Sequence, residues 1–167
     1  VNDSALDHAA VARLAATPGA FDLACGMDHD QRAGPVPAEP RRRRFYDVWV
    51  GRDLEGDTLL RAWPHWKHEA DTWLQAQGAP LAAKCCWNGA AVASAEPFAE
   101  GLRFRRGADG PHDCDDSECS VLCRDMRRRG YGNVVVNPTV WHGDAYGQRT
   151  KAPPPPPSPL APARSGT

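Results

Sequence analysis

Hydrophobic side chains near the start of the chain recur at the spacing of a helix. Leu6, Ala10 and Leu14 lie four residues apart, so they form one face of a helix. Asp7 or Ser4 is a suitable N-cap for this helix, and the Thr-Pro-Gly sequence that follows Ala16 is a suitable stop. The pattern therefore predicts a helix in the first 16 residues.

A second helix is predicted after Ser117, which is a suitable N-cap. Four apolar side chains then follow at positions i, i+3, i+4 and i+7, which gives one buried stripe: Cys119, Leu122, Cys123 and Met126. Gly130 is suited to end the helix.

Strands are predicted between and after these helices. Residues 21–27 alternate between larger and smaller or polar side chains, residues 45–50 are aromatic and β-branched, and residues 131–137 contain three consecutive valines closed by Pro138. Residues 51–57 are predicted to be a turn region. Residues 81–93 form two short apolar segments around Trp87-Asn88-Gly89, where the Asn-Gly pair favours a turn. This mixture of helices and strands is typical of an α/β fold.

Two proline-rich stretches interrupt the pattern. Residues 151–167 contain seven prolines and hardly any large apolar side chain, which predicts a disordered or polyproline II tail after a domain over residues 1–150. Residues 28–44 contain three prolines and end in four arginines. The arginines are interpreted as a solvated loop, with the lining of an anion-binding pocket as the alternative.

Composition excludes some classes of function. The chain has 167 residues and carries 20 basic and 21 acidic side chains, for a net charge of −1. This balance argues against nucleic-acid binding, which requires a surplus of basic side chains. No stretch approaches the roughly 20 apolar residues that span a bilayer, and no leader is visible. Because the chain starts with valine, we expect it to be a fragment. The lack of an anchor in this fragment therefore says little about the parent protein.

The cysteine pattern has more than one interpretation. Cys114, Cys119 and Cys123 are spaced C-x4-C-x3-C, and His112 lies close enough in sequence to be a fourth zinc ligand. This spacing does not match a compact zinc knuckle, and two of the cysteines belong to the apolar stripe. Core thiols or one disulfide are therefore favoured over a metal site. The pairing of all six cysteines cannot be assigned from the sequence, which allows 15 connectivities.

Polar candidates for chemistry are few. Glu118 falls in the first turn of the predicted helix, where it either only complements the helix dipole or accepts a hydrogen bond or proton from a substrate. Asp3 is either an ordinary helix-start acid or a ligand of a divalent cation, and His142 is either a surface histidine or a second ligand. Trp63, Trp66 and Trp73 have the spacing of one amphipathic segment, and they are interpreted as core residues or as a surface that stacks on sugars.

Five sequence blocks together resemble a known family. They are NDSALDHAAVARLAATPGAFDLACGMD, FYDVWVGRDLEG, CCWNGAAVASAEPF, GLRFR and SECSVLCRDMRRRGYGNVVVNPTV, which occur in this order between Asn2 and Val140. The chain resembles the fungal capsule-associated mannosyltransferases of the cryptococcal α-1,3-mannosyltransferase type, glycosyltransferase family 69. Residues 28–44 and the proline-rich tail are not part of this resemblance.

The resemblance implies a fold, a reaction and a location. It implies a GT-A-like α/β glycosyltransferase of which this chain is the C-terminal portion, without the N-terminal nucleotide-binding half. The implied reaction transfers mannose from GDP-mannose to a glycan hydroxyl with the help of Mn or Mg. The parent protein is expected to be anchored in the membrane and to face the lumen of the Golgi or secretory pathway. A catalytically inactive glycan-binding or interaction remnant of this fold is the alternative.

Roles for individual residues follow from the same resemblance. Glu118 and Asp47 are expected to be catalytic carboxylates, and Asp3 is expected to hold the metal. His142, which lies beyond the resemblance, is expected to be the second metal ligand. Substrate contacts are expected from the remaining candidates: Trp87, Asn88, Gly89, Arg52 and Asp53. These assignments require Asp3 and Glu118 to face each other across one sugar-nucleotide pocket.

Overall fold

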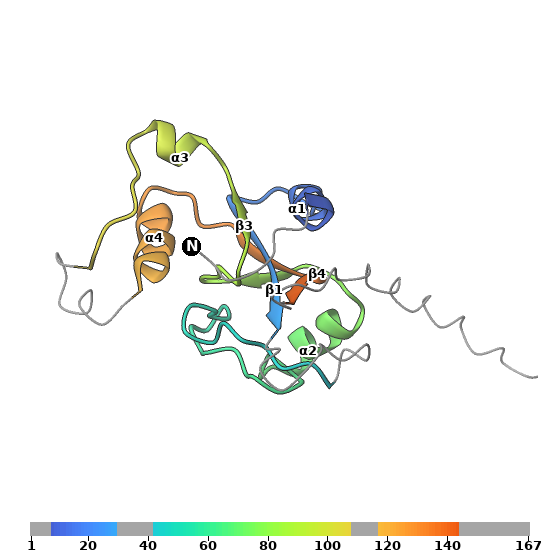
Figure 1. The fold of residues 1–167 in the computed structure, drawn as a ribbon. Helices are drawn as coiled ribbons and strands as arrows, with labels where there is room; N and C mark the ends of the chain where they lie inside the picture. Colours follow the sequence, from blue (N-terminus) through green and yellow to red (C-terminus); the bar gives the residue numbers. More distant parts are fainter. Residues whose placement is uncertain (1–7, 30–41, 108–116, 144–167) are drawn as a thin grey trace, which may run out of the picture.

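A four-stranded mixed sheet organises the computed structural model, which describes residues 8–29, 42–107 and 117–143 (Figure 1). The strand order is β2-β4-β1-β3, and the two central strands, β1 and β4, are parallel. The two edge strands are antiparallel to their neighbours. The strands are β1 Leu23–His29, β2 Leu81–Ala83, β3 Ala91–Ala93 and β4 Val134–Gly143. The sheet and the helices around it confirm the α/β class.

Strand β1 is buried along its whole length because both faces of the sheet are covered. Leu23, Cys25 and Met27 point into the larger hydrophobic cluster, whereas Ala24 belongs to a smaller cluster on the opposite face. The predicted strand at residues 21–27 is therefore confirmed, although it begins and ends two residues later. As a result, the polar residues Asp28 and His29 are buried at its carboxyl end.

Helix α1, His8–Ala15, covers one face of the sheet (Figure 1). Its buried residues Ala10 and Leu14 pack with Ala24 and Val140. This confirms the helical pattern predicted for the first segment within the residues that the structure describes.

The chain that covers the other face is largely irregular, and the strand predicted at residues 45–50 is wrong. Phe45 forms a single bridge with His29, after which the chain turns at residues 48–50. The amides of Phe45 and Tyr46 donate to the carbonyls of Arg61 and Asp28, which lie on two different segments. Aromatic and β-branched side chains are present here because Phe45 and Val50 enter the core.

The tryptophans that follow do not share one helix. Helix α2, Glu69–Ala76, contains only Trp73, which is 62% exposed. Trp66 precedes the helix and is completely buried in the main cluster. The prediction that Trp63, Trp66 and Trp73 share one amphipathic segment is therefore wrong. The predicted core position is confirmed for Trp66. A short helix, α3 Glu96–Ala99, follows β3.

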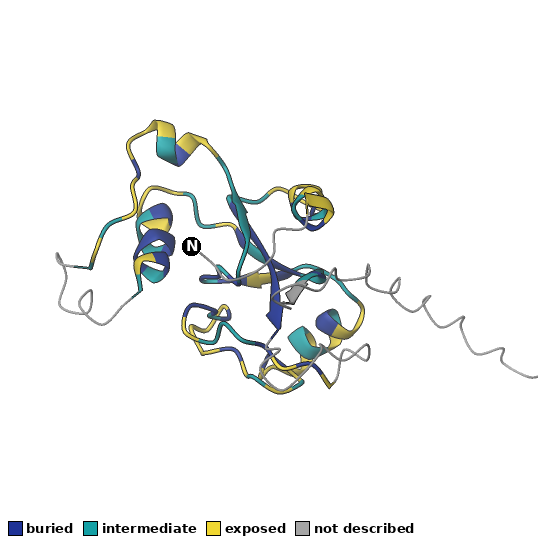
Figure 2. Ribbon diagram, in the orientation of Figure 1, coloured by how far each residue is buried: buried dark blue, intermediate teal, exposed yellow. Residues whose placement is uncertain are grey.

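Helix α4, Glu118–Arg128, matches its sequence pattern closely. The Ser117 hydroxyl oxygen accepts a hydrogen bond from the Ser120 amide at 3.2 Å, as expected of an N-cap. Gly130 has a φ of +91° after the helix end. The predicted stripe is buried together with Val121, and the opposite side of the helix is exposed (Figure 2).

Strand β4 continues through Pro138, which was predicted to end it. The pairing with β1 shifts between Cys25 and Met27, whose partners are Val136 and Trp141. Proline is tolerated at such an irregularity because the ladder does not require its missing amide hydrogen there. The Asn137 carboxamide oxygen accepts from the Thr139 amide at 3.1 Å and so holds the bulge.

The turn predicted at Trp87-Asn88-Gly89 is confirmed, because Asn88 and Gly89 have φ values of +51° and +82°. It does not connect a hairpin, since β2 and β3 lie at opposite edges of the sheet. The chain crosses the sheet between them.

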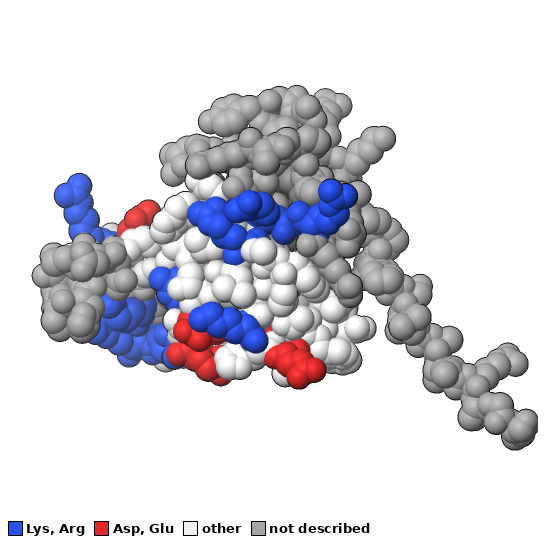
Figure 3. All heavy atoms as spheres, turned by 90° about the horizontal axis from the view of Figure 1, so that it is seen from below, with Lys and Arg blue, Asp and Glu red and all other residues white. Residues whose placement is uncertain are grey.

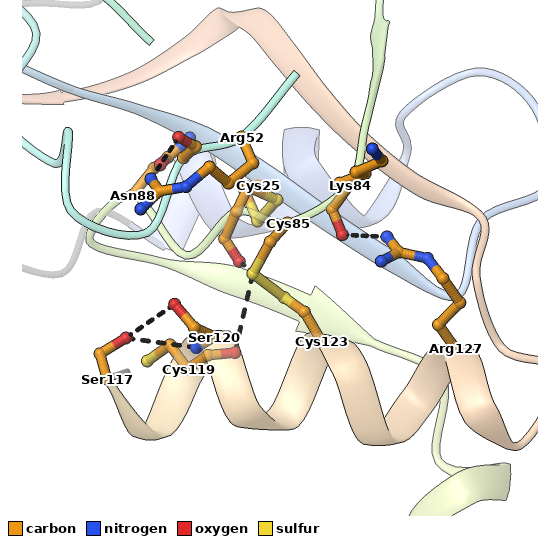
Figure 4. The surroundings of a disulfide bond; sticks show 12 residues. Cys25, Arg52, Lys84, Cys85, Asn88, Ser117, Cys119, Ser120, Cys123 and Arg127 are labelled. Atoms are coloured by element: carbon orange, nitrogen blue, oxygen red, sulfur yellow. Dashed lines mark hydrogen bonds between the residues drawn. A yellow bond between two sulfur atoms is a disulfide. The ribbon is translucent and has the colours of Figure 1, made fainter. Parts of the chain in front are cut away.

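Two disulfides meet at adjacent residues before this turn (Figure 4). Cys25 of β1 is bonded to Cys86, and Cys123 of α4 is bonded to Cys85. Cys119 is a buried free thiol on the same side of α4. These states agree with the expected core thiol and disulfide. The Arg127 guanidinium donates to the Lys84 carbonyl and adds a second connection between α4 and this segment.

Several expectations fall outside the described residues: those for Asp3, Arg41, His112 and Cys114, and for the tail at 151–167. Among the described residues, no helix combines the length and apolar character needed to cross a membrane.

We predict that the Cys85–Cys123 bond stabilises the fold by linking α4 to the sheet. The double substitution Cys85→Ala/Cys123→Ala should lower the free energy of unfolding by about 4 kcal/mol, because the closed loop joins residues 38 apart. Denaturant unfolding without reductant measures this loss. Cys119→Ala is the matched control on the same helix and should cost much less. Equal losses in the two variants would contradict the prediction.

Candidate functional site

A hydrogen bond joins two of the sequence blocks at the centre of the candidate site. The Asn88 amide donates to Oδ2 of Asp47 at 2.9 Å, although the two residues are 41 positions apart. Asp47 lies in the irregular chain after Phe45, and Asn88 lies in the turn after the two adjacent cysteines. The fold therefore brings together a predicted catalytic carboxylate and a predicted substrate-binding residue.

Asn88 is held firmly in this position. Its side chain is fully buried, and Nδ2 donates to the Gly26 carbonyl of β1 at 2.8 Å. Asparagine tolerates the left-handed conformation found here better than most residues, and glycine at the next position tolerates it at little cost. The Asn-Gly sequence is thus explained by backbone geometry and by one buried hydrogen bond, and this geometry directs the Asn88 amide to the Asp47 carboxylate.

Asp47 is a half-buried carboxylate whose pKa is raised. Burial is the largest cause, and it outweighs hydrogen bonds from the amides of Asn88 and Val50 and the positive charge of Arg52, which lower the pKa. The Arg52 Nη1 itself donates to the Gly51 and Val48 carbonyls at 2.9 and 3.3 Å (Figure 4). Arg52 therefore adds positive charge to the surroundings of Asp47 while its own position is fixed by the backbone.

The negative charges of Glu118 and Asp47 both act on the pKa of one buried thiol. Glu118 is exposed in the first turn of α4, directly before the buried Cys119. Burial raises the pKa of the Cys119 thiol to about 12, and the negative charges of Glu118 and Asp47 contribute to the increase. The raised pKa also keeps the thiol protonated and unreactive at neutral pH.

Trp87 and Asp53 behave differently from the residues around Asp47. Trp87 is half-buried, and its ring meets the edge of the Phe104 ring at a centroid distance of 5.5 Å. Asp53 is buried, and its Oδ1 accepts a hydrogen bond from the Asp57 amide at 2.7 Å. Trp87 therefore stays next to the site, whereas the Asp53 carboxylate is directed into its own turn.

The predicted metal ligands are only partly located. Asp3 lies outside the described residues, so its expected position opposite Glu118 stays a prediction. The backbone of His142 lies near the end of β4, in register with Asp28 of β1. His142 is therefore placed at the carboxyl edge of the parallel strand pair.

This carboxyl edge contains buried polar residues that sequence reasoning missed. Asp28, His29, Arg43 and His65 are all at least nine-tenths buried there or beside it, and the Arg43 guanidinium lies 4.5 Å from the centre of the Trp141 ring. Burial lowers the pKa values of Arg43 and His65. Ligands of open α/β sheets typically bind at the carboxyl ends of parallel strands. The solvated-loop interpretation is therefore wrong for Arg43, and the alternative of an anion-binding pocket stays a prediction.

An exposed aromatic side chain lies close to Asp47 along the chain. Trp49 is 55% exposed, and its ring contacts the edge of the Tyr46 ring at a centroid distance of 5.3 Å. The Arg61 guanidinium lies 5.4 Å from the centre of the same tryptophan ring. Such an ordered, exposed aromatic ring is suited to stacking on a sugar. The sequence analysis did not single out Trp49, although it lies within one of the five blocks.

Charged side chains are distributed unevenly on the surface. On the face seen in Figure 3, Lys and Arg side chains gather along the upper part and at the left, and carboxylates gather near the lower edge. The small net charge of −1 therefore conceals local basic and acidic regions.

Comparison with known proteins defines the class of this α/β protein. Residues 1–125 match the family described as Cryptococcal mannosyltransferase 1, and the chain belongs to this family. It is 32% identical over 112 residues to the Alpha-1,3-mannosyltransferase CMT1 of Cryptococcus neoformans var. neoformans serotype D (strain JEC21 / ATCC MYA-565). This match covers 60% of the chain and 24% of the relative. No solved structure matches the chain.

We predict that Asp47 costs stability when it is ionised in the folded protein. Its folded pKa is raised, so the contribution is most favourable below the pKa of the unfolded chain and is lost as the pH rises through the folded pKa. Asp47→Asn should therefore be more stable than the parent chain at pH 7, and the difference should shrink below about pH 4. Unfolding curves at several pH values measure this. A variant that is less stable at pH 7 would contradict the prediction.

Proposed function

We propose that this chain is part of a glycosyltransferase that transfers mannose from GDP-mannose to a hydroxyl of a glycan and forms an α-1,3 linkage. The family membership over residues 1–125 carries this proposal. The hydrogen bond between Asp47 and Asn88 supports it, because this bond joins two separate blocks that contain predicted site residues.

In the proposed reaction, Asp47 and Glu118 act on the sugars. A carboxylate with a raised pKa is suited to accept a proton from the acceptor hydroxyl, and this role is assigned to Asp47. Glu118 is exposed and orients a sugar hydroxyl by accepting its hydrogen bond. Trp87 and Asn88-Gly89 form the wall beside them, and the positive charge of Arg52 stabilises developing negative charge. Asp53 is better assigned to the turn that it forms.

The proposed donor site lies at the carboxyl edge of β1 and β4. Asp3 and His142 are assigned to a divalent cation, Mn or Mg, which stabilises charge on the departing diphosphate when bound. The residue types at this edge suit such an ion, because Asp28 on β1 lies in register with His142 on β4. The buried Arg43 adds positive charge near the same edge. A GT-A-like arrangement of the complete enzyme is part of this proposal.

The cysteines support the proposed location. Disulfides form and persist in oxidising compartments, and two of them connect β1, α4 and the intervening chain. We therefore assign the protein to the lumen of the Golgi or secretory pathway, with a membrane anchor in the parent protein.

A glycan-binding protein without catalytic activity is the second candidate. Exposure of the Trp49 ring favours it, because stacking on a sugar does not require a donor site. The two functions differ in their need for Asp47, which only the transferase uses in a chemical step.

The decisive test replaces the matching segment of the Cryptococcus relative with residues 1–143 of this chain. We expect the chimera to transfer mannose from GDP-mannose to the relative's acceptor, since the swapped segment contains the proposed carboxylates and the whole described sheet. Product analysis by mass spectrometry measures transfer, and a melting curve confirms folding. A folded chimera that binds glycan but transfers no mannose would overturn the proposal in favour of the second candidate.

Carboxylate substitutions in the same chimera test the residue roles. Asp47→Asn and Glu118→Gln should each reduce kcat by about 100-fold or more, because each removes a group that acts on a reacting or bound hydroxyl. Glu96→Gln is the control, since Glu96 is also an acidic residue in the first turn of a helix but lies outside the site. Unchanged kcat in Glu118→Gln would remove Glu118 from the site.

A further inference from the structure

Three potential metal ligands meet on the side of the molecule formed by the 53–57 turn and α2. One ligand atom each from Asp53, Glu55 and His68 lies within 4.8 Å of the others. Nε2 of His68 is 3.3 Å from Oε2 of Glu55. Ligand atoms that share one metal ion at about 2.0–2.2 Å are themselves about 3–4 Å apart. The three side chains are therefore already close to the spacing that a shared ion requires.

The 53–57 turn fixes the Asp53 carboxylate without help from a ligand. The Asp53 amide donates to the Asp57 carbonyl at 3.0 Å, and the Asp57 amide returns a bond to Oδ1 of Asp53. Glu55 lies inside this closed turn. The turn bond uses only Oδ1 of the Asp53 carboxylate. The residue is buried, with 1% of its surface exposed.

His68 reaches the turn from a different element. It occupies the N-cap position of α2, but its side chain makes no capping hydrogen bond. The imidazole is instead directed to Glu55. Because the imidazole of His68 makes no capping hydrogen bond and lies beside two carboxylates, it is positioned as a metal ligand.

The local charge favours a cation. Asp71, in the first turn of α2, has a raised pKa because of burial and because Glu55 and Asp53 add negative charge, and His68 compensates only in part. The nearby ammonium of Lys67 is paired with Asp57 at 3.2 Å instead. This part of the surface therefore carries more negative than positive charge, and a divalent ion would balance it.

We propose that Asp53, Glu55 and His68 form a binding site for a divalent transition-metal ion of the Zn²⁺ or Mn²⁺ class. One imidazole and two carboxylates suit these ions, whereas Ca²⁺ and Mg²⁺ prefer oxygen ligands alone. These residues are not the ones assigned to the donor-site ion, which are Asp3 and His142. The ion joins the 53–57 turn to the start of α2, two segments that no strand connects within the described residues, and so stabilises the chain that covers the sheet.

Metal titration of the untagged full chain tests the site without any assay of transfer. We expect Zn²⁺ and Mn²⁺ to raise the melting temperature and to show in calorimetry one binding event that depends on Glu55 and His68, in addition to any binding at Asp3 and His142, and Ca²⁺ to bind far more weakly at Glu55 and His68. Glu55→Gln and His68→Gln should each weaken Zn²⁺ binding at least about tenfold while keeping the metal-free melting temperature close to that of the parent.

A matched control separates this site from general electrostatic attraction. Asp57→Asn removes an exposed carboxylate from the same turn but leaves all three ligands, so its Zn²⁺ affinity should remain within about twofold of the parent. The absorption spectrum of bound Co²⁺ should lack a thiolate charge-transfer band. Unchanged affinity in His68→Gln, or a thiolate band that places the ion at a cysteine, would overturn the proposal.

Discussion

The structure depends on the pair of adjacent cysteines that crosses the sheet between β2 and β3. Cys86 is bonded to β1, and Cys85 is bonded to α4, so one dipeptide fixes the central strand and the last helix relative to each other. Within the described residues, the edge strands contain only three residues each, and much of one sheet face is covered by irregular chain. Covalent bonds therefore supply rigidity that longer regular elements would otherwise provide.

The geometry of the candidate site depends on the segment that crosses the sheet between β2 and β3. The turn that follows the cysteines places Asn88 between β1, through the Gly26 carbonyl, and the irregular chain, through Asp47. Burial of Asp47 has an energetic cost for an ionised carboxylate. A carboxylate retained at the expense of stability is typical of a functional site rather than of a structural one.

The same irregular chain carries a second polar cluster on its outer side. Asp53 follows Arg52 directly, yet its carboxylate is directed to the 53–57 turn instead of to Asp47. Neighbouring residues in one sequence block thus serve two separate regions, because the backbone reverses at Arg52 to pair with both Cys85 and Thr58. The sequence block placed Arg52 and Asp53 together as predicted substrate contacts, and it did not indicate that the Asp53 carboxylate forms a turn.

Local interactions were sufficient to predict α1, α4 and the Asn88-Gly89 turn, because spacing, caps and positive φ are properties of consecutive residues. The family, too, was evident from ordered blocks in the sequence. Residues 45–50 were mispredicted because their apolar side chains enter a core without strand partners, and Pro138 was mispredicted because a bulge accommodates it. The disulfide pairing, the burial of Arg43 and the approach of Asp47 to Asn88 were decided only by the tertiary structure, since each depends on segments that are distant in sequence and meet only when the sheet forms.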